Sequence, residues 1–135
     1  MKATIGHIGI NLSNSKQSFL FWKELLSYLD FQIIEEGNSH FDANDGTSYL
    51  CISEVEEKYK ANGFHRKRIG LNHIALKVSS PKLVDQFVAD FLTPRNIPVL
   101  YDGVKAYPEY LEGYYAVYFE DPDRIKVEIV YEPTI

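Results

Sequence analysis

Two histidines stand at the start of two similar alternating segments. The first segment is GHIGINL, in which His7 precedes Ile8, Ile10 and Leu12, and the second is GLNHIALKV, in which His73 precedes Ile74, Leu76 and Val78. A period of two is typical of a β-strand with one apolar face, so both imidazoles are expected on the face opposite the apolar residues. A lone strand histidine is most often an ordinary core or surface residue. The repetition is what makes a shared role worth testing.

A glutamate near the C-terminus is the third candidate. Glu128 lies within IKVEIVY, between Val127 and Ile129. A carboxylate in an apolar strand is costly to bury without a partner, so it requires either a cation or an exposed face, which here would also carry Lys126. Two imidazoles and one carboxylate suit Zn²⁺, Ni²⁺, Mn²⁺ or Fe²⁺, and three protein ligands leave positions open for water or substrate. The hypothesis is therefore a catalytic divalent metal site at His7, His73 and Glu128, and the alternative is that Glu128 faces solvent.

The elements that position these residues occur twice. Apolar residues at helical spacing predict a helix over 13–29, with Ser13, Asn14 or Ser15 as N-cap, and another over 80–92, with Ser80 as N-cap. Short β-like runs follow each helix: FQIIEE and SYLCIS in the first half, and IPVLYD, YYAVYFE and IKVEIVY in the second. The two halves align without a gap when the numbers are shifted by 66 (73 − 7), with matches from His7 on His73 to Leu26 on Leu92, which indicates an internal duplication. A tyrosine-rich segment at 101–115 in the second half has no counterpart in the first.

The duplication predicts an α+β fold made of two tandem βαβββ modules, at 5–53 and 71–131, joined by a charged connector at 54–70. The whole chain, 1–135, is expected to form one domain. One helix covers only one face of each sheet, so the two sheets side by side are expected to form a curved, cup-shaped mixed sheet with the helices on its outer face. The two histidines and Glu128 would then face the interior of the cup.

Composition narrows the class of protein. The 135 residues include one cysteine, Cys51, so no disulfide framework within the chain is expected. The N-terminal segment lacks the apolar stretch of a secretory signal, and no apolar run approaches the roughly 20 residues of a membrane span. A net charge of −5 disfavours nucleic acid as a partner. These features predict a cytoplasmic protein with neither a membrane nor a nucleic acid as its partner.

Taken together, the duplicated modules, the His-Ile openings of the two strands and the closing segment FEDPDRIKVEIV resemble the vicinal oxygen chelate superfamily. This group includes glyoxalase I, extradiol dioxygenases, fosfomycin-resistance transferases and bleomycin-binding proteins. The resemblance covers residues 5–131, and it implies that His7, His73 and Glu128 hold a metal ion that chelates two neighbouring oxygens of a small-molecule substrate. It also implies that the modules pair within one chain or across a dimer, and a homodimer is expected.

The fourth metal position of the family falls within SYLCIS. Matching YLCI to KVEI places Cys51 there, whereas a count from the preceding turn places Leu50. Glyoxalase I has a glutamate at this position, and its absence puts that activity in doubt. Cys51 is interpreted either as a buried small residue or as a soft ligand that favours zinc.

Several residues are candidates for contact with the substrate. Tyr118 matches a substrate-contacting tyrosine of the fosfomycin-resistance group and is a candidate proton donor, while Glu128 is the other candidate for moving protons. Tyr101 and Tyr115 belong to a tyrosine-rich set that either lines the cup or fills the sheet, and Arg124 follows a turn near the expected mouth. The sequence therefore predicts a metal-dependent lyase, isomerase or thiol transferase, and the alternative is a metal-free protein that binds a drug or metabolite.

Overall fold

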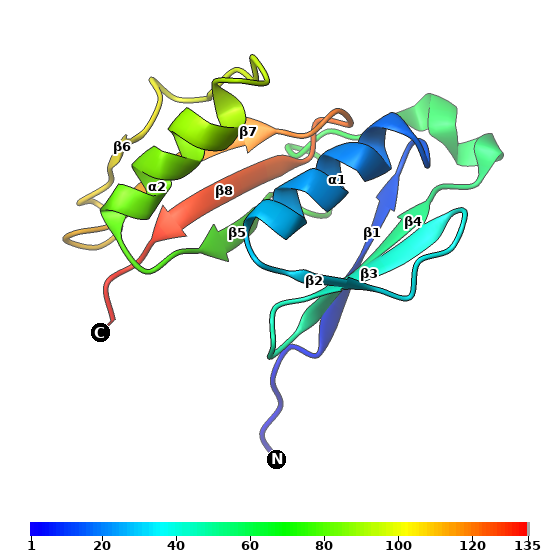
Figure 1. The fold of residues 1–135 in the computed structure, drawn as a ribbon, viewed down its shortest axis with the longest axis horizontal. Coiled ribbons are helices and arrows are strands. Elements are labelled where there is room, and N and C mark those ends of the chain that lie inside the picture. Colours follow the sequence, from blue (N-terminus) through cyan, green and yellow to red (C-terminus); the bar gives the residue numbers. More distant parts are fainter. Residues whose placement is uncertain (135) are drawn as a thin grey trace. The chain divides into compact units, whose positions relative to one another are not determined.

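The computed structural model describes residues 1–134, and the chain divides into two compact units, Met1–Gly63 and Phe64–Ile135. Each unit contains one four-stranded mixed sheet and its helices (Figure 1). In each unit the first strand runs parallel to the last one, and the remaining pairs are antiparallel. The fold class is α+β, and both units have the predicted βαβββ order.

In the first unit, β1 (His7–Leu12) is followed by α1 (Gln17–Tyr28) and then by β2 (Gln32–Ile34), β3 (His40–Asn44) and β4 (Tyr49–Glu54). The strand order across the sheet is β1-β4-β3-β2. One face of the sheet packs under the apolar stripe of α1, where the rings of Phe19 and Phe41 meet edge to face at 5.3 Å. A short 3-10 helix, η1 (Glu57–Asn62), follows the last strand.

The second unit repeats this plan. Its elements are β5 (Ile74–Lys77), α2 (Pro81–Phe87), a single π-helical turn η2 (Val88–Leu92), β6 (Lys105–Ala106), β7 (Tyr115–Glu120) and β8 (Lys126–Tyr131). The strand order is β5-β8-β7-β6. As predicted, Ser80 caps α2, since its hydroxyl accepts a hydrogen bond from the Leu83 amide, and Pro81 occupies the first turn.

The two faces of the second sheet differ in chemistry. Residues that stand opposite each other in the strand register share a face, so Val127, Ile129, Val117 and Phe119 lie under α2, where Phe119 packs against Phe87. Glu128, directly opposite Tyr118 and Ala75, lies on the other face. The alternation in the sequence therefore predicted correctly which side of this sheet carries Glu128.

Three local predictions differ from the structure. The segment IPVLYD forms only an isolated bridge, Val99 to Phe119, because the chain turns with positive φ at Tyr101 and Asp102. The predicted order included three strands after the first helix, but the sequence did not locate β3, since His40, Asp42 and Asn44 give it a polar face. Helix α1 begins later than expected, with Lys16 at its N-cap position, although Asn14 Oδ1 accepts hydrogen bonds from the Lys16 and Ser18 amides.

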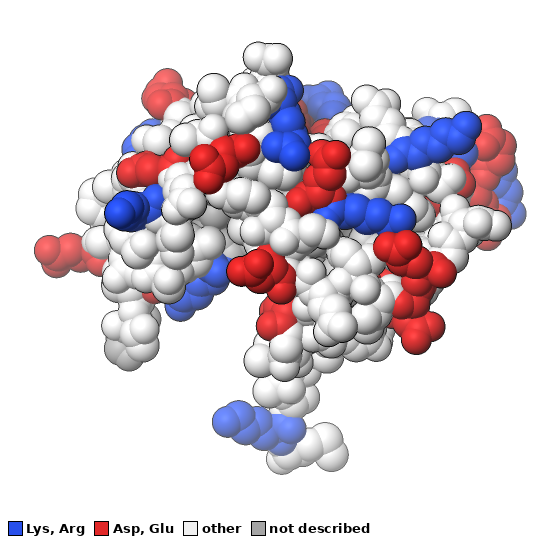
Figure 2. All heavy atoms as spheres, viewed as in Figure 1, with Lys and Arg blue, Asp and Glu red and all other residues white. Residues whose placement is uncertain are grey.

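The surface shows mixed charge. Acidic and basic side chains are interspersed over the face shown in Figure 2, and none of the helices formed by residues 1–134 is long and apolar enough to cross a membrane.

Candidate functional site

The carboxyl group of Glu128 is the centre of the candidate site, on the face of the second sheet that lies opposite α2. Its side chain is fully buried. The hydroxyl of Tyr114 donates a short hydrogen bond to Oε1 of Glu128. The other oxygen, Oε2, accepts no hydrogen bond within the described part of the chain, although it is shielded from water. A buried carboxylate with one oxygen that accepts no hydrogen bond is unfavourable, so Glu128 lowers the stability of the folded chain.

His73 faces that unused oxygen. Its Nε2 atom lies 3.1 Å from Glu128 Oε2, while its Nδ1 atom lies 2.7 Å from the amide oxygen of Asn72. An amide oxygen can only accept a hydrogen bond, so Nδ1 carries a proton. When the ring is neutral, Nε2 keeps its lone pair and faces the carboxylate oxygen as a second electron-rich atom. This donor pair fits a divalent cation.

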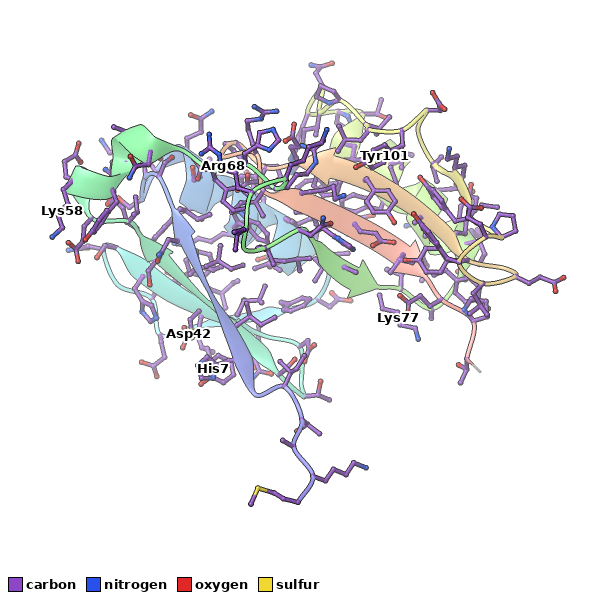
Figure 3. All side chains as sticks on the ribbon, turned by 180° about the vertical axis from the view of Figure 1, so that it is seen from behind. His7, Asp42, Lys58, Arg68, Lys77 and Tyr101 are labelled. Atoms are coloured by element: carbon purple, nitrogen blue, oxygen red, sulfur yellow. The ribbon has the colours of Figure 1, made fainter. Side chains whose placement is uncertain are left out.

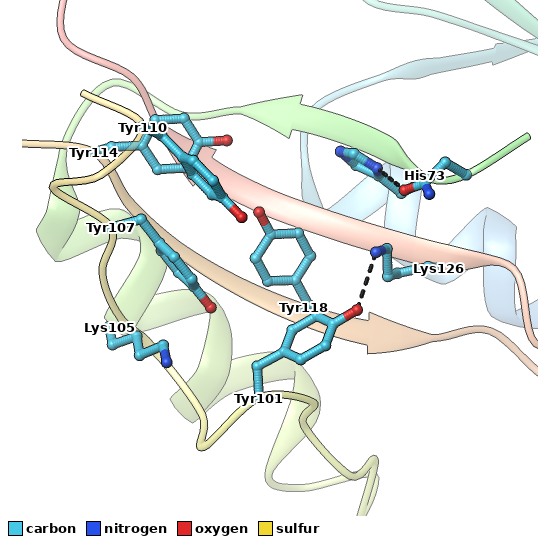
Figure 4. A pocket seen from close by; sticks show the side chains of 9 residues that line it. His73, Tyr101, Lys105, Tyr107, Tyr110, Tyr114, Tyr118 and Lys126 are labelled. Atoms are coloured by element: carbon cyan, nitrogen blue, oxygen red, sulfur yellow. Dashed lines mark hydrogen bonds between the residues drawn. The ribbon is translucent and has the colours of Figure 1, made fainter. Parts of the chain in front are cut away.

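A cavity of about 380 Å³ lies beside this pair and is formed only by residues of the second unit (Figure 4). Its walls are mainly phenol rings, joined by two lysines, His73 and Asn72; the tyrosines are Tyr101, Tyr107, Tyr110, Tyr114 and Tyr118. The rings meet mostly edge to face, with centroids 5.3 to 6.2 Å apart where Tyr118 and Tyr107 contact their neighbours. The lining is flat and aromatic, with hydroxyl groups available for hydrogen bonding.

The phenols nearest Glu128 stay protonated at neutral pH. Burial, together with hydrogen bonding to Glu128, raises the pKa of both Tyr114 and Tyr118 well above the ordinary value for tyrosine. These groups are therefore hydrogen-bond donors beside the carboxylate. The Tyr118 ring also contacts the His73 ring edge to face at 6.0 Å.

On the same face of β8, two residues before Glu128, the Lys126 ammonium donates a hydrogen bond to the Tyr101 hydroxyl over 3.1 Å. This hydrogen bond holds the pKa of Tyr101 below its usual value, and Arg66 acts in the same direction. The phenols of the cavity thus differ: those beside Glu128 are held neutral, whereas Tyr101 lies in a positive environment.

The first unit carries the other predicted ligands. His7 is exposed at the start of β1 and stacks on Tyr49, with ring centroids 4.8 Å apart. The register pairs Gly9 with Cys51 in this unit and Ala75 with Glu128 in the other. Since Gly9 corresponds to Ala75 in the duplication, Cys51 rather than Leu50 is the counterpart of Glu128.

Cys51 has polar neighbours in the first unit. It lies opposite Asp42, and His40 Nε2 is 2.9 Å from Asp42 Oδ1. Burial raises the pKa of the Cys51 thiol, and Asp42 raises it further. By register His7, His40, Asp42 and Cys51 share one face of the sheet (Figure 3 labels His7 and Asp42).

The structure places two predicted substrate-contacting residues away from the cavity. The Tyr115 hydroxyl donates a hydrogen bond to Asp85 Oδ1 on α2, on the opposite face of the sheet. Arg124 follows the turn between β7 and β8, where its Nε atom lies 3.5 Å from Glu120 Oε2. Of the substrate-contacting residues predicted from the sequence, Tyr101 and Tyr118 do line the cavity.

Lys126 lines the cavity, a role that the sequence did not predict. The sequence placed it on the same face as Glu128, and one alternative had that face open to solvent. In the structure Lys126 is 9% exposed, so that alternative does not hold for its side chain.

The described residues of either unit contain no ready-made group of three His, Cys, Asp or Glu side chains that would hold a metal ion. His73 and Glu128 provide two donor atoms in the second unit.

Comparison with known proteins defines the class. No family model matches the chain. It is 36% identical over 124 residues to the uncharacterized protein YqjT of Bacillus subtilis strain 168, covering 92% of this chain and 95% of that protein. The crystal structure of a "putative glyoxalase" from Bacillus halodurans has 33% identity, with 97% of both chains covered and a TM-score of 0.84.

A more distant structure has the same fold. It is a glyoxylase/bleomycin resistance protein/dioxygenase domain from Frankia sp. EAN1pec, with 17% identity, a TM-score of 0.74, and coverage of 98% of this chain and 100% of that one. The chain belongs to the vicinal oxygen chelate superfamily, the group of glyoxalase, bleomycin-resistance and dioxygenase proteins.

Proposed function

We propose that the protein is a metal-dependent enzyme of the lyase, isomerase or thiol transferase type that acts on a small molecule in the tyrosine-lined cavity. His73 and Glu128 would be two of the ligands of a divalent ion, with Zn²⁺, Ni²⁺, Mn²⁺ and Fe²⁺ as candidates. Bound there, such an ion would supply a Lewis acid for two neighbouring oxygens of the substrate.

One observation carries this proposal: Glu128 Oε2 is buried and accepts no hydrogen bond, yet it lies 3.1 Å from an imidazole nitrogen. When the His73 ring is neutral, its hydrogen bond to Asn72 keeps the proton on Nδ1 and leaves Nε2 without one. In metal-binding histidines, a hydrogen bond made by the ring nitrogen that does not bind the metal fixes the tautomer and the orientation of the ring. The fixed orientation favours a ligand role over an incidental contact.

The surrounding phenols support a reaction in which a proton moves. Tyr114 orients Glu128 through Oε1, which leaves Oε2 directed at His73. Tyr118 lines the cavity as a neutral phenol and would donate a hydrogen bond, or a proton, to a substrate oxygen. Glu128 is the other candidate for moving a proton, as the sequence predicted.

The remaining ligands belong to the first unit and stay predictions. His7 is the third ligand predicted from the sequence, and it is exposed at the start of β1. Cys51 occupies the strand position that corresponds to Glu128 and is the candidate for a fourth. The same prediction allows the first unit of a second copy of the chain to supply these ligands in a homodimer.

A second candidate function is supported by the lining of the cavity. Five phenol rings and two lysines provide enough surface and hydrogen bonding to bind a drug or metabolite without any chemistry. In that case His73 would carry a second proton and pair with Glu128 as an imidazolium, and no metal would be required.

Metal content separates the two candidates. Protein purified without chelators or a histidine tag is dialysed against each of the four ions and analysed for bound metal. We expect about one ion per chain in the wild type, and binding at least roughly tenfold weaker in His73→Ala and Glu128→Gln, because each removes one ligand. His65→Ala is the matched control, since it removes a histidine that lies outside the cavity.

A wild-type protein that takes up none of the four ions would contradict the enzyme proposal and favour the metal-free candidate. His7→Ala tests the third ligand separately: unchanged metal affinity would remove His7 from the site without affecting the roles of His73 and Glu128.

A further inference from the structure

The side chains that line the cavity carry positive charge, although the protein is acidic overall. The chain has a net charge of −5. Nevertheless, the described residues that line the cavity include two lysines, Lys105 and Lys126, and no carboxylate. The carboxylate of Glu128 lies behind the lining, where Tyr114 already donates a hydrogen bond to it. Within low-dielectric walls, the two ammonium groups favour an anion that contacts them directly.

The two lysines are not equivalent. The side chain of Lys105 is 43% exposed, and its ammonium lies 3.9 Å from Asp102, so much of its charge is already compensated. Lys126 is 9% exposed and forms no ion pair with any residue from 1 to 134. Its ammonium contacts the Tyr101 hydroxyl and lies 5.3 and 5.5 Å from the centroids of the Tyr101 and Tyr118 rings. Phenol rings offset only part of the cost of burying a cation, so Lys126 lacks an anionic partner.

A second polar group of the cavity is also incomplete. Tyr107 is 5% exposed, and its hydroxyl is buried without a hydrogen-bond partner among the described residues. Figure 4 shows the hydroxyl groups of Tyr107 and Tyr101 and the ammonium of Lys126 directed into the cavity. An unpartnered hydroxyl and an unpaired ammonium in one cavity are matched by a ligand that brings oxygen atoms with negative charge.

The backbone around Tyr101 adds a further sign of function. Tyr101 and Asp102 have φ angles of 55° and 66°, a left-handed conformation that is unfavourable for residues with a side chain. This turn places the Tyr101 hydroxyl against Lys126. Strain of this kind is commonly retained at ligand-binding positions. The lowered pKa of Tyr101 reflects the same positive environment.

We infer that the substrate class of this cavity is the aromatic carboxylates, with the carboxylate bound by the Lys126 ammonium and the Tyr101 and Tyr107 hydroxyls, and the flat ring packed between phenols. The inference rests on the proposed function in that it concerns the same cavity. It does not depend on the metal, because neither Lys126 nor Tyr107 is one of the proposed ligands.

Calorimetric titration of benzoate and of benzamide tests the inference. The two probes have the same flat ring, and only benzoate is charged at neutral pH. We expect benzoate to bind the wild type at least roughly tenfold more tightly than benzamide at low salt, since a charge-assisted hydrogen bond in a cavity is worth at least that factor. The preference should shrink as salt is added.

Two variants identify the groups responsible. Lys126→Met should reduce benzoate binding by roughly tenfold or more and leave benzamide binding nearly unchanged. Lys82→Met is the matched control, because it removes the same charge from α2 on the other side of the sheet and should leave both affinities unaltered. Tyr107→Phe should weaken benzoate binding by roughly tenfold, the effect of one hydrogen bond to a charged acceptor.

Circular dichroism checks that each variant is folded. If Lys126→Met does not fold, the inference is tested by the preference of the wild type for benzoate and by the effect of Tyr107→Phe. Equal affinity for the two probes, no detectable binding of benzoate, or a benzoate affinity unchanged by the folded variants would overturn the inference.

Every titration is made on chelator-treated protein and on zinc-treated protein. If the wild type takes up none of the four ions and still prefers benzoate, the anion site is supported and the metal proposal is contradicted. Metal binding without that preference would do the reverse.

Discussion

Replacing Glu128 by glutamine should make the metal-free protein more stable and abolish its response to metal. The change keeps the shape of the side chain and exchanges one carboxylate oxygen for an amide NH₂ group. The amide oxygen can still accept the hydrogen bond from Tyr114, while the NH₂ group can donate to His73 Nε2, which lies 3.1 Å from the replaced oxygen. The substitution therefore replaces an oxygen that accepts no hydrogen bond by a group that can donate one, and it removes a buried charge.

The size of the effect follows from that unsatisfied atom. A buried polar group without a partner costs about 1 to 3 kcal/mol, so the free energy of unfolding should rise by about that amount. An unfolding entropy of about 2.1 cal/mol/K per residue gives about 3.5 °C in Tm for each kcal/mol in a chain of this length. Thermal unfolding at pH 8 with a chelator should accordingly show a Tm higher by about 4 to 10 °C.

Adding Zn²⁺ in place of the chelator should raise the Tm of the wild type, because a ligand that binds the folded state stabilises it, and should leave Glu128→Gln nearly unchanged. Glu120→Gln is the matched control. Glu120 is paired with Arg66 at 2.7 Å and with Arg124 at 3.5 Å, so the same chemical change should lower its Tm. A lower Tm for Glu128→Gln in chelator, or an equal zinc response in both proteins, would refute this reasoning.

Two other predictions concern the opposite face of the second sheet and the choice of substrate. The hydrogen bond from Tyr115 to Asp85, together with burial, raises the pKa of Tyr115 to about 12, above its unfolded value of 10.0. The contribution of this hydrogen bond to stability is therefore complete below pH 10 and is lost as the pH rises toward 12. In denaturant titrations at pH 7, the free energy of unfolding of Tyr115→Phe should be lower than that of the wild type by about 1 kcal/mol. The difference should shrink above pH 10. Turnover of methylglyoxal with glutathione should be weak or absent, because the resemblance to glyoxalase I places Cys51 at the position of a glutamate in that enzyme; robust activity in a spectrophotometric assay would show that this carboxylate is dispensable.

The sequence was sufficient for features that repeat or alternate. The recurrence of His7 at His73 and the apolar alternation around each predicted the two modules. The same alternation placed Glu128 on the face of its sheet away from α2, as the register of β7 and β8 confirms. These predictions succeeded because strand periodicity depends only on local sequence.

Burial could not be predicted in the same way. Lys126 reads as a surface residue, and only the folded chain shows that tyrosines distant in sequence enclose it. The bond between Tyr114 and Glu128 was equally hidden, because Tyr114 precedes β7 and its position depends on the turn around Leu111. Contacts of this kind arise from loops, whose paths have no period.

The matching strand positions of Cys51 and Glu128 also bear on how the chain diverged after its duplication. Two copies of one module began with the same residue at this point, and the present chain has a thiol in one and a carboxylate in the other. A single substitution, Cys51→Glu, would return the two copies to equivalence at this strand position. The two duplicated modules thus differ at a strand position where one residue changes the available chemistry.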